Sequence, residues 1–239
     1  MNGVILLNKP EGITSFDVIR TLRSITKIKK IGHAGTLDPF ATGLLIVCIS
    51  REATRHINTF SQLGKTYTAV LKLGDKTDTG DREGKIIETK PVPYSVEQNV
   101  QTVFSSFIGE IDQIPPQFSA IKKNGVRLYK TARKGISIEV EPRKVVIHSL
   151  TFKSYHKPYL EFNTSVSKGT YIRSLGEDIA NKLNTVGHLT ELRRDSIGPF
   201  TLEEAINLND LTDQNIEMFI RPVENFINQV QHFTYEKSA

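Results

Sequence analysis

Several short stretches of the chain have the apolar patterns of strands. Residues 3–7 and 44–49 are continuous apolar runs, which predict a first strand and a buried strand. Apolar and polar positions alternate over residues 65–74, 145–152 and 160–166, and this alternation predicts three more strands. Residues 186–196 are also expected to be extended.

Other stretches have the apolar spacing of helices. A Thr14 or Ser15 cap precedes four apolar residues at helical spacing, which are Phe16, Ile19, Leu22 and Ile25. Residues 53–63, 95–107 and 170–183 are predicted as further helices, the second with a Ser95 cap. The buried stripe of the third is expected to be Ile172, Leu175, Ile179 and Leu183.

Three loops and a helical C-terminal part complete the pattern. Residues 32–43 form a glycine-rich loop, residues 75–84 a polar loop, and residues 115–142 an irregular surface insertion rich in proline, glycine and basic residues. Residues 202–226 are predicted as short helices, and residues 232–239 as a polar tail that frays. Strands and helices mix without a strict βαβ rhythm, so we expect an α+β fold with helices packed on a sheet.

Composition narrows the class of protein. The chain has 239 residues, of which 38% are hydrophobic and 24% charged, as in ordinary globular proteins. No apolar run is long enough to span a bilayer, and the N-terminus lacks the basic region and cleavage site of a signal peptide. The single cysteine, Cys48, lies in an apolar run and is predicted to be a buried thiol. These features fit a cytoplasmic protein.

Charge adds a weak indication of a polyanionic partner. The formal net charge is +5, with a pI of about 9.2. Basic residues cluster at residues 27–30, 122–134 and 193–194, and Tyr129 and Tyr171 lie among or near such positions. Each cluster alone is typical of a solvated face, but several of them together favour a phosphate backbone as ligand.

The most informative segment is the glycine-rich loop at residues 32–43. Its three glycines permit tight turns and close approach of a ligand to the backbone. Asp38 precedes Pro39, which favours an extended conformation, and a buried strand follows the loop. A lone aspartate before proline is most often a turn residue, whereas a carboxylate on such a loop can also point into a cleft.

Three further segments stand out. Residues 167–173 join a strand to a helix and place Arg173 in its first turn, where solvent-facing arginines are common. Residues 65–69 open a strand and include Tyr67, which alone would be a half-buried aromatic. Residues 115–122 have the sequence PPQFSAIK and precede Gly125 and Tyr129.

These segments resemble motifs of the TruB-type tRNA pseudouridine-55 synthases and follow one another in the same order as in that family. The resemblance also includes the LNKPEGITS stretch at residues 7–15 and Leu192-Arg193-Arg194. The resemblance runs from Gly3 to about Phe200. It implies the pseudouridine synthase fold, with a central mixed, largely antiparallel sheet flanked by helices. It also implies a catalytic domain over residues 1–200 with an RNA-binding insertion at 115–142. Residues 201–239 are then a short helical tail, too short for a complete PUA domain.

The resemblance also implies roles for particular residues. Asp38 matches the essential aspartate, Tyr67 the tyrosine that stacks on the target base, and Arg173 the arginine that pairs with the aspartate. His33 matches the histidine that holds the flipped-out nucleotides, and Leu192 matches an apolar wall beside the uracil. The other residues expected to bind substrate are Lys9, Lys65 and Tyr171.

The chemistry is consistent with these roles. Isomerisation of uridine breaks the bond from ribose to N1 and rejoins ribose at C5, without redox change or net hydrolysis, so no cofactor or metal is needed. A carboxylate in a dry pocket serves as nucleophile or base, and the sequence leaves open which atom Asp38 attacks or deprotonates. The base must flip out of the folded loop, and stacking on Tyr67 would offset part of that energy.

The expected partner is the T arm of tRNA. We expect the protein to be a monomer that does not associate with a membrane. Five basic residues of the insertion are predicted to contact its phosphates, namely Lys122, Lys123, Arg127, Lys130 and Arg133.

Two alternatives remain: an RNA-binding module or tRNA chaperone without catalysis, and a metal-dependent nuclease using the acidic residues of segment 75–83. That acidic segment lacks EF-hand spacing and His or Cys ligands, so a solvated loop is the preferred interpretation.

Overall fold

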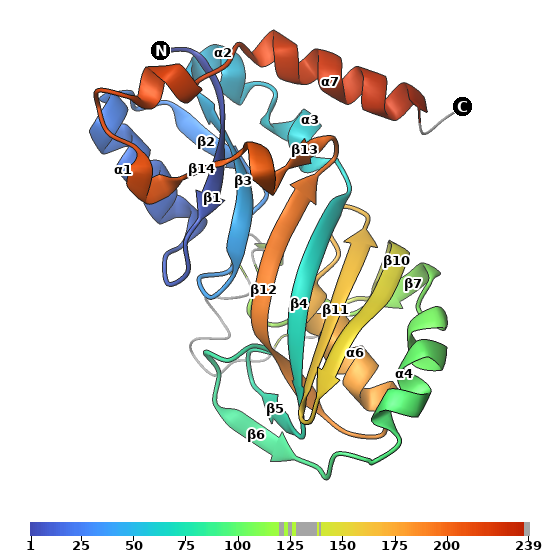
Figure 1. Ribbon diagram of the computed structural model, residues 1–239. Helices are drawn as coiled ribbons and strands as arrows, with labels where there is room; N and C mark the ends of the chain where they lie inside the picture. Colours follow the sequence, from blue (N-terminus) through green and yellow to red (C-terminus); the bar gives the residue numbers. More distant parts are fainter. Residues whose placement is uncertain (120–121, 124–125, 128–137, 139, 237–239) are drawn as a thin grey trace. The chain divides into compact units, whose positions relative to one another are not determined.

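The computed structural model describes residues 1–119, 122–123, 126–127, 138 and 140–236 (Figure 1). Contacts between Cα atoms divide the chain into two compact units. Unit 1 contains residues 1–67 and 192–239, and unit 2 contains residues 68–191. Two strands pass from one unit to the other, β4 (Lys65–Leu73) and β12 (Gly187–Ile197).

The strands of unit 1 have the order β14-β1-β3-β12. β1 (Gly3–Lys9) pairs antiparallel with β3 (Thr42–Ile49) and parallel with β14 (Ile206–Asn207). β3 also pairs with β2 (Ile31–Ala34), and β12 with β13 (Phe200–Thr201). The predicted loop over residues 32–43 therefore begins inside a strand, because residues 32–34 belong to β2.

β1 and β3 are apolar over most of their length, as suits strands whose two faces are both covered. Val4, Leu6 and Leu44 belong to one hydrophobic cluster, whereas Ile5 and Leu45 belong to another. Cys48 is fully buried in the first cluster, as predicted, and burial raises the pKa of its thiol to about 12.

The first helix shows how local sequence sets an element in unit 1. α1 (Ser15–Thr26) begins after Thr14, whose side chain accepts a hydrogen bond from Asp17 N, and Asp17 completes the capping box. The cap was predicted correctly. The predicted buried face was wrong at Phe16, which is 55% exposed, and Val18 occupies the face instead. Ile19 and Leu22 are buried as predicted.

The other helices of unit 1 are short or lie at the end of the chain. The predicted helix at residues 53–63 is two helices, α2 (Ser50–Thr54) and α3 (Ile57–Ser61). After β12 come the 3-10 turns η1 (Leu202–Glu204), η2 (Leu208–Asp210) and η3 (Ile216–Phe219), then α7 (Val223–Glu236). α7 includes residues 232–236, the first part of the expected polar tail, whereas residues 237–239 lie outside the described residues. Leu208 and Phe226 pack into the two hydrophobic clusters.

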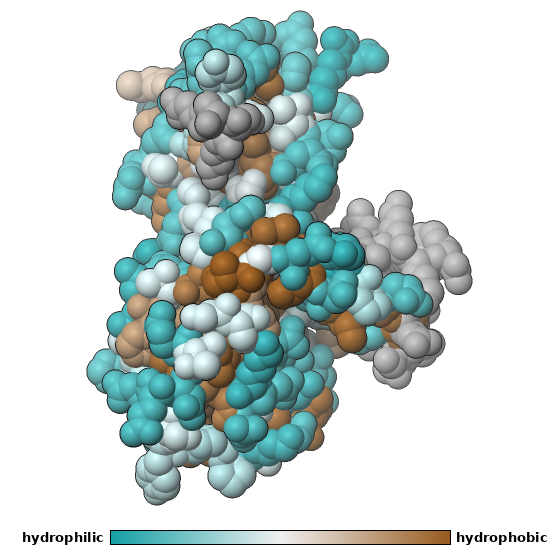
Figure 2. Space-filling view, turned by 90° about the vertical axis from the view of Figure 1, so that its right-hand side faces the viewer, coloured by the Kyte–Doolittle hydropathy of each residue, from teal (hydrophilic) through white to brown (hydrophobic). Residues whose placement is uncertain are grey.

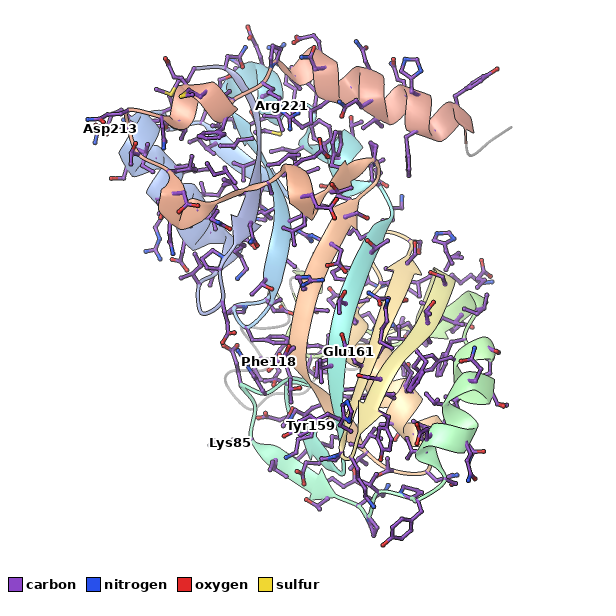
Figure 3. The ribbon with its side chains drawn as sticks, viewed as in Figure 1. Lys85, Phe118, Tyr159, Glu161, Asp213 and Arg221 are labelled. Atoms are coloured by element: carbon purple, nitrogen blue, oxygen red, sulfur yellow. The ribbon has the colours of Figure 1, made fainter. Side chains whose placement is uncertain are left out.

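The strands of unit 2 have the order β12-β4-β11-β10-β7. β10 (Arg143–His156) pairs antiparallel with β11 (Tyr159–Val166) and with β7 (Gly109–Gln113), a strand that was not predicted. Tyr159 and Glu161, both on β11, are marked in Figure 3, and Ser154 Oγ of β10 donates a hydrogen bond of 3.1 Å to Glu161. β4 alternates between buried and half-buried residues, as its pattern predicts.

Two helices pack against the strands of unit 2 (Figure 1). α4 (Val96–Ser105) places Phe104 edge-on to Phe162 of β11, at 5.9 Å between ring centroids. α6 (Ile172–Lys182) buries Ile172, Leu175 and Ile179, three of the four predicted positions, and Leu183 is buried just after its end. Ser95 precedes α4 but makes no side-chain capping bond, contrary to prediction.

The remaining elements of unit 2 are two hairpins. β5 (Asp75–Thr77) pairs with β6 (Ile86–Thr89), so the predicted polar loop at residues 75–84 begins with a strand. β8 (Lys122–Lys123) pairs with β9 (Val126–Arg127) inside the predicted irregular insertion. Most of the rest of that insertion lies outside the described residues.

The expected α+β class, with a mixed and largely antiparallel sheet flanked by helices, is confirmed. Hydrophilic residues cover most of the face in Figure 2, and hydrophobic residues gather mainly in one group on it. Among the helices described, none has the length and apolarity needed to cross a bilayer.

Candidate active site

The segment that carries Asp38, residues 35–44, is fixed by hydrogen bonds to its backbone from several parts of unit 1. The Ser15 hydroxyl, fully buried at the start of α1, accepts a hydrogen bond from Leu37 N and donates one to Leu37 O, at 2.8 and 3.1 Å. The carbonyl of Asp38 accepts a bond of 3.1 Å from Ala41 N. The residue directly before Asp38 therefore has both of its backbone polar groups fixed by one side chain.

The residue after Asp38 is held by the segment that follows β1. Pro39 O accepts hydrogen bonds from Gly12 N at 2.9 Å and from Lys9 Nζ at 3.2 Å. Lys9 is fully buried and also donates to Pro10 O and Ile13 O, both at 2.8 Å. Its ammonium thus binds backbone carbonyls of two loops, and its predicted contact with substrate stays a prediction.

The two ends of the segment are joined by Arg194 of β12. The Arg194 guanidinium donates to Gly35 O at 3.1 Å and to Leu44 O at 2.8 Å. Arg194 is only 1% exposed, so of the basic pair at residues 193–194 only Arg193 faces solvent. No role of its own was predicted for Arg194, because a single sequence does not distinguish a buried arginine from an exposed one.

β4 brings Lys65 and Tyr67 into unit 1. Tyr67 is 7% exposed, so the ring that is predicted to stack on the base is largely enclosed by protein. Lys65 is buried, and its ammonium donates to Ser61 O at 3.2 Å and Leu63 O at 2.6 Å. Like Lys9, it binds backbone carbonyls, and its role toward substrate stays a prediction.

His33 and Leu192 also lie in unit 1. His33 is a half-buried residue of β2, and its Nδ1 is buried with no hydrogen-bond partner among the described residues. Burial, and next the charge of Arg194, lower the pKa of His33 below its ordinary value. The imidazole is therefore largely neutral at pH 7, and its interactions with a ligand are those of an uncharged ring. Leu192 on β12 is buried, which suits an apolar wall.

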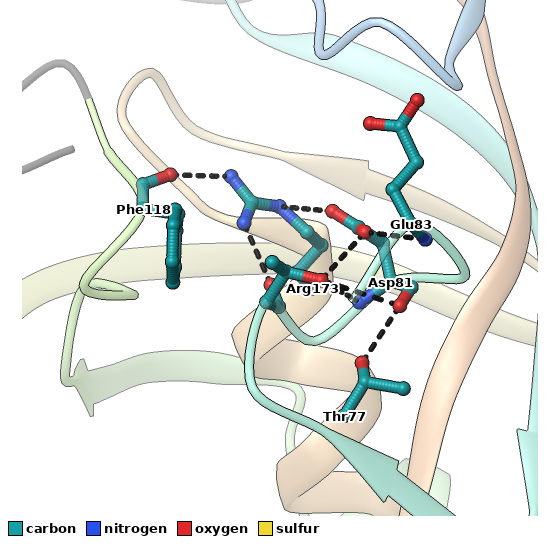
Figure 4. A network of polar contacts seen from close by, with 6 residues as sticks. Thr77, Asp81, Glu83, Phe118 and Arg173 are labelled. Carbon is teal, nitrogen blue, oxygen red and sulfur yellow. Dashed lines mark hydrogen bonds and ion pairs between the residues drawn. The ribbon is translucent and has the colours of Figure 1, made fainter. Parts of the chain in front are cut away.

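Arg173 lies in unit 2, in the first turn of α6, and is buried, contrary to the solvent-facing position that is common there. It donates to Thr79 O at 2.8 Å and to Phe118 O at 2.9 Å (Figure 4). Its Nε lies 3.7 Å from Asp81 Oδ2, and both side chains are almost fully buried. The structure thus gives Arg173 a carboxylate partner within its own unit. Pairing of Arg173 with Asp38 concerns residues of different units and stays a prediction.

Asp81 corrects the interpretation of residues 75–84 as a solvated loop. It is 4% exposed, and its Oδ1 accepts hydrogen bonds from Thr79 Oγ1 at 2.7 Å and Glu83 N at 3.0 Å (Figure 4). Thr77 Oγ1 donates to its carbonyl at 2.7 Å. The loop has several acidic residues, and no pattern in the sequence marks which of them is buried.

Tyr171 precedes α6, and its backbone is held by the fully buried Gln113 at the end of β7. Gln113 accepts from Tyr171 N at 2.8 Å and donates to Tyr171 O at 3.0 Å. The Arg143 guanidinium lies 4.7 Å from the centroid of the Tyr171 ring. Sequence reasoning missed Gln113, because a lone glutamine in an unpredicted strand gives no signal.

The predicted phosphate contacts fall in the partly described insertion. Lys122 and Lys123 lie on β8 and Arg127 on β9, whereas Lys130 and Arg133 lie outside the described residues. Their role stays a prediction. Across the described part of the chain, no group of three or more His, Cys, Asp or Glu side chains is placed to hold a metal ion.

Solved structures share this fold. A chain in the Cbf5-Nop10-Gar1 complex superposes with a TM-score of 0.74 at 31% identity, over 95% of this chain and 62% of that one. A chain in the archaeal box H/ACA sRNP Nop10-Cbf5 complex gives 0.68 at 30% identity, over 97% and 62%. This chain therefore spans less than two thirds of those solved chains. The fold is that of the pseudouridine synthases.

Sequence comparison gives the family. The model of the TruB family pseudouridylate synthase N-terminal domain matches residues 23–172, and that of the tRNA pseudouridylate synthase B C-terminal domain matches residues 173–228. Proteins named tRNA pseudouridine synthase B are 46% identical in Clostridium tetani, over 99% of this chain and 82% of theirs, and 42% identical in Hydrogenovibrio crunogenus, over 97% and 76%. The chain belongs to the TruB family of pseudouridylate synthases.

Family membership confirms the resemblance found in the sequence and the assignment to an isomerase class. The comparisons do not test single residues, and the predicted roles of Asp38, Tyr67, Arg173 and His33 stay predictions. The domain boundary predicted at residue 200 is likewise untested, although the division into compact units follows other residues.

Proposed function

We propose that this protein isomerises uridine 55 in the T-loop of tRNA to pseudouridine, with Asp38 as the catalytic carboxylate. The observation that carries the proposal is the Asp38 segment itself. Hydrogen bonds hold the backbone at Gly35, Leu37, Pro39 and Leu44, so the carboxylate is carried on a preorganised loop. The similarity to proteins named tRNA pseudouridine synthase B supports tRNA as the substrate.

In the proposed reaction, the target uridine flips out of the loop and stacks on Tyr67, beside the apolar wall of Leu192. The Asp38 carboxylate acts as nucleophile or base while the bond from ribose to N1 breaks, and ribose is rejoined at C5. Roles for Arg173 and Tyr171 in the same reaction are proposed from the resemblance of the sequence to the family. No metal or organic cofactor takes part, because the reaction is neither a redox step nor a net hydrolysis.

His33 is proposed to contact the flipped-out nucleotides as a neutral ring. Its lowered pKa removes a charge attraction to phosphate at neutral pH, so its contribution comes from stacking and hydrogen bonding. Phosphate contacts are assigned instead to the basic insertion, including Lys130 and Arg133, where they supply affinity that falls with salt. We further propose that the enzyme works as a monomer in the cytoplasm.

The test is a position-resolved assay for pseudouridine on a tRNA transcript, run with EDTA present. Pseudouridine at position 55 is expected, and none on a transcript with cytidine there. Binding without modification would favour an RNA-binding module or tRNA chaperone. RNA cleavage that needs an added divalent ion would favour a nuclease, and either result would overturn the proposal. The chelated reaction should contain enough monovalent salt to keep the tRNA folded.

A further inference from the structure

Arg194 is the most deeply buried arginine of unit 1 in the described part of the chain. It extends from β12, is 1% exposed, and donates from Nε to Leu44 O and from Nη2 to Gly35 O. These two carbonyls lie on either side of the segment that contains Asp38. One planar guanidinium therefore joins the beginning and the end of this segment, as its fork of donors permits.

The backbone of Arg194 adds a second constraint at the same place. Arg194 pairs with Gly43 in the parallel pairing of β12 with β3. Gly43 has a φ of +103°, and a Cβ placed on it would lie 2.4 Å from Arg194 O. The pairing fixes the chain at residue 43, and the side chain extends the restraint to residue 35, which the pairing does not reach.

The charge of Arg194 makes this arrangement expensive in free energy. Among the described residues Arg194 forms no ion pair with a carboxylate, so its cation is stabilised by carbonyl dipoles. Burial of a charged group costs free energy that hydrogen bonds to neutral partners offset only in part, so a buried guanidinium is a poor means of stabilising a fold. What it supplies here is a fixed geometry for two carbonyls.

We propose that Arg194 is a positioning residue for catalysis, which fixes the loop carrying Asp38 by holding Gly35 O and Leu44 O. The proposal rests on the proposed role of Asp38. Arg194 acts on the loop and not on tRNA, so its loss lowers the rate of isomerisation and leaves tRNA affinity unchanged. Small displacements of a catalytic group have large effects on rate, and we expect a fall in kcat of about 10²-fold.

The experiment compares Arg194→Met and Arg194→Lys with the wild type and with Arg51→Met, a change of an exposed arginine in α2 of unit 1. The kcat, the single-turnover rate, the tRNA affinity and urea unfolding are measured for each. Arg194→Met should lose rate at unchanged affinity. Arg194→Lys should recover part of the rate, because an ammonium keeps the charge but lacks the fork that spans two carbonyls. Arg51→Met should match the wild type.

A second readout does not depend on activity. The Arg194 charge is one cause of the lowered pKa of His33, so an NMR titration of His33 should move upward in Arg194→Met, toward the ordinary value. Arg194→Gln, which also lacks the charge but keeps an amide donor, replaces the methionine variant if that variant does not fold. The Asp38→Asn enzyme is assayed in parallel: if it stays active, the proposed function has failed, and the His33 titration still reports on Arg194.

A folded neutral variant with wild-type kcat would overturn the proposal. So would a loss confined to tRNA affinity, which would make Arg194 a binding residue. An unchanged His33 titration in a folded neutral variant would also count against it, because the guanidinium would then not occupy the place that the structure gives it. Reduced kcat, unchanged affinity and a raised His33 pKa together would support it.

Discussion

Two loops that support predicted site residues are fixed by charges of opposite sign. The first loop is residues 35–44 of unit 1, around Asp38, and the second is residues 77–83 of unit 2, around Asp81. In unit 1, the buried cations Lys9 and Arg194 donate to backbone carbonyls of the segment around Asp38. In unit 2, the buried carboxylate of Asp81 accepts from a backbone N–H and a hydroxyl of its own loop and pairs with Arg173. Cations fix the first loop from outside, whereas an anion within the second loop fixes both the loop and an arginine of α6.

This difference predicts what substitutions in each loop should do to rate and to stability. A carbonyl that loses a cationic donor is itself uncharged and can shift slightly, so damage to the first loop should be geometric and should appear mainly in the rate. Removing one member of a buried ion pair leaves the other charge buried without its counter-charge, so damage to the second loop should appear mainly as lost stability. Four substitutions can break or sharpen this comparison.

The largest effect is expected from Asp38→Asn. The amide has nearly the shape of the carboxylate but cannot act as nucleophile or base, so turnover should fall by at least about 10²-fold. Binding of tRNA should stay largely intact. Pseudouridine formation under single-turnover conditions and a filter-binding assay on the same sample measure the two quantities. An Asp38→Asn enzyme with near-normal turnover would remove Asp38 from the mechanism.

Asp81→Asn should primarily destabilise the protein. It takes a buried negative charge from beside Arg173, and the free energy of unfolding should fall by roughly 3 kcal/mol. Urea unfolding gives the value, with Asp112→Asn, an exposed carboxylate on β7, as the matched control expected to change little. Equal stability of the two variants would show that the ion pair contributes nothing to the fold.

Gly43→Ala tests how tightly the first loop is seated. Gly12 and Gly43 both have positive φ, at +83° and +103°, but only at Gly43 does an added Cβ meet backbone, at 2.4 Å from Arg194 O. Gly12→Ala should cost about 1–2 kcal/mol of unfolding free energy from backbone strain. Gly43→Ala should cost about 1–3 kcal/mol more through overpacking. Equal losses in urea unfolding would mean that β3 can move away from β12.

The smallest effect concerns a second carboxylate of unit 2. Burial, and next the charge of Glu177, raise the pKa of Asp178 on α6 to about 6 from its ordinary 3.8. The folded state thus holds the Asp178 proton more tightly than the unfolded state, so this group favours folding below pH 4 and loses that contribution as pH rises through 6.

Asp178→Asn should therefore stabilise the protein at pH 8, by up to about 1 kcal/mol after solvent screening. The gain should shrink as pH falls toward 4. Urea unfolding at several pH values measures it, and a gain independent of pH would exclude titration of Asp178 as the cause. Together with Asp81→Asn, this contrasts a carboxylate that has a close arginine partner with one whose charge is disfavoured.

Sequence patterns predicted the elements with strong periodicity. The apolar run of β3, the alternation of β4 and the capped start of α1 are found where they were expected. β7 was missed because its GEIDQ sequence has little apolar content and only Gln113 is fully buried. Separating α2 from α3 also escaped prediction, because the break between them lies in a stretch of continuous helical spacing.

At the site, sequence motifs identified the family and the segment around Asp38 but not its supports. Ser15, Arg194 and Asp81 owe their importance to burial and to partners far away in the chain, such as Leu37 for Ser15 and Gly35 for Arg194. A single sequence contains no record of such partners. Polar residues in loops, at helix starts and on strands that are not buried on both faces are usually solvated, and that expectation concealed all three.

The division of unit 1 between the two ends of the chain bears on how the protein is synthesised. β1 can pair with β3 as soon as both leave the ribosome, but β14, Phe200 and Phe226 emerge only after all of unit 2. Until then, one edge of β1 and part of a hydrophobic cluster lack their native cover. We expect ribosome-bound chains that stop at residue 191 to be cleaved by protease within residues 1–67, and chains carrying residues 192–239 on a C-terminal extension to resist. A newly made chain therefore depends on its last residues to protect its first.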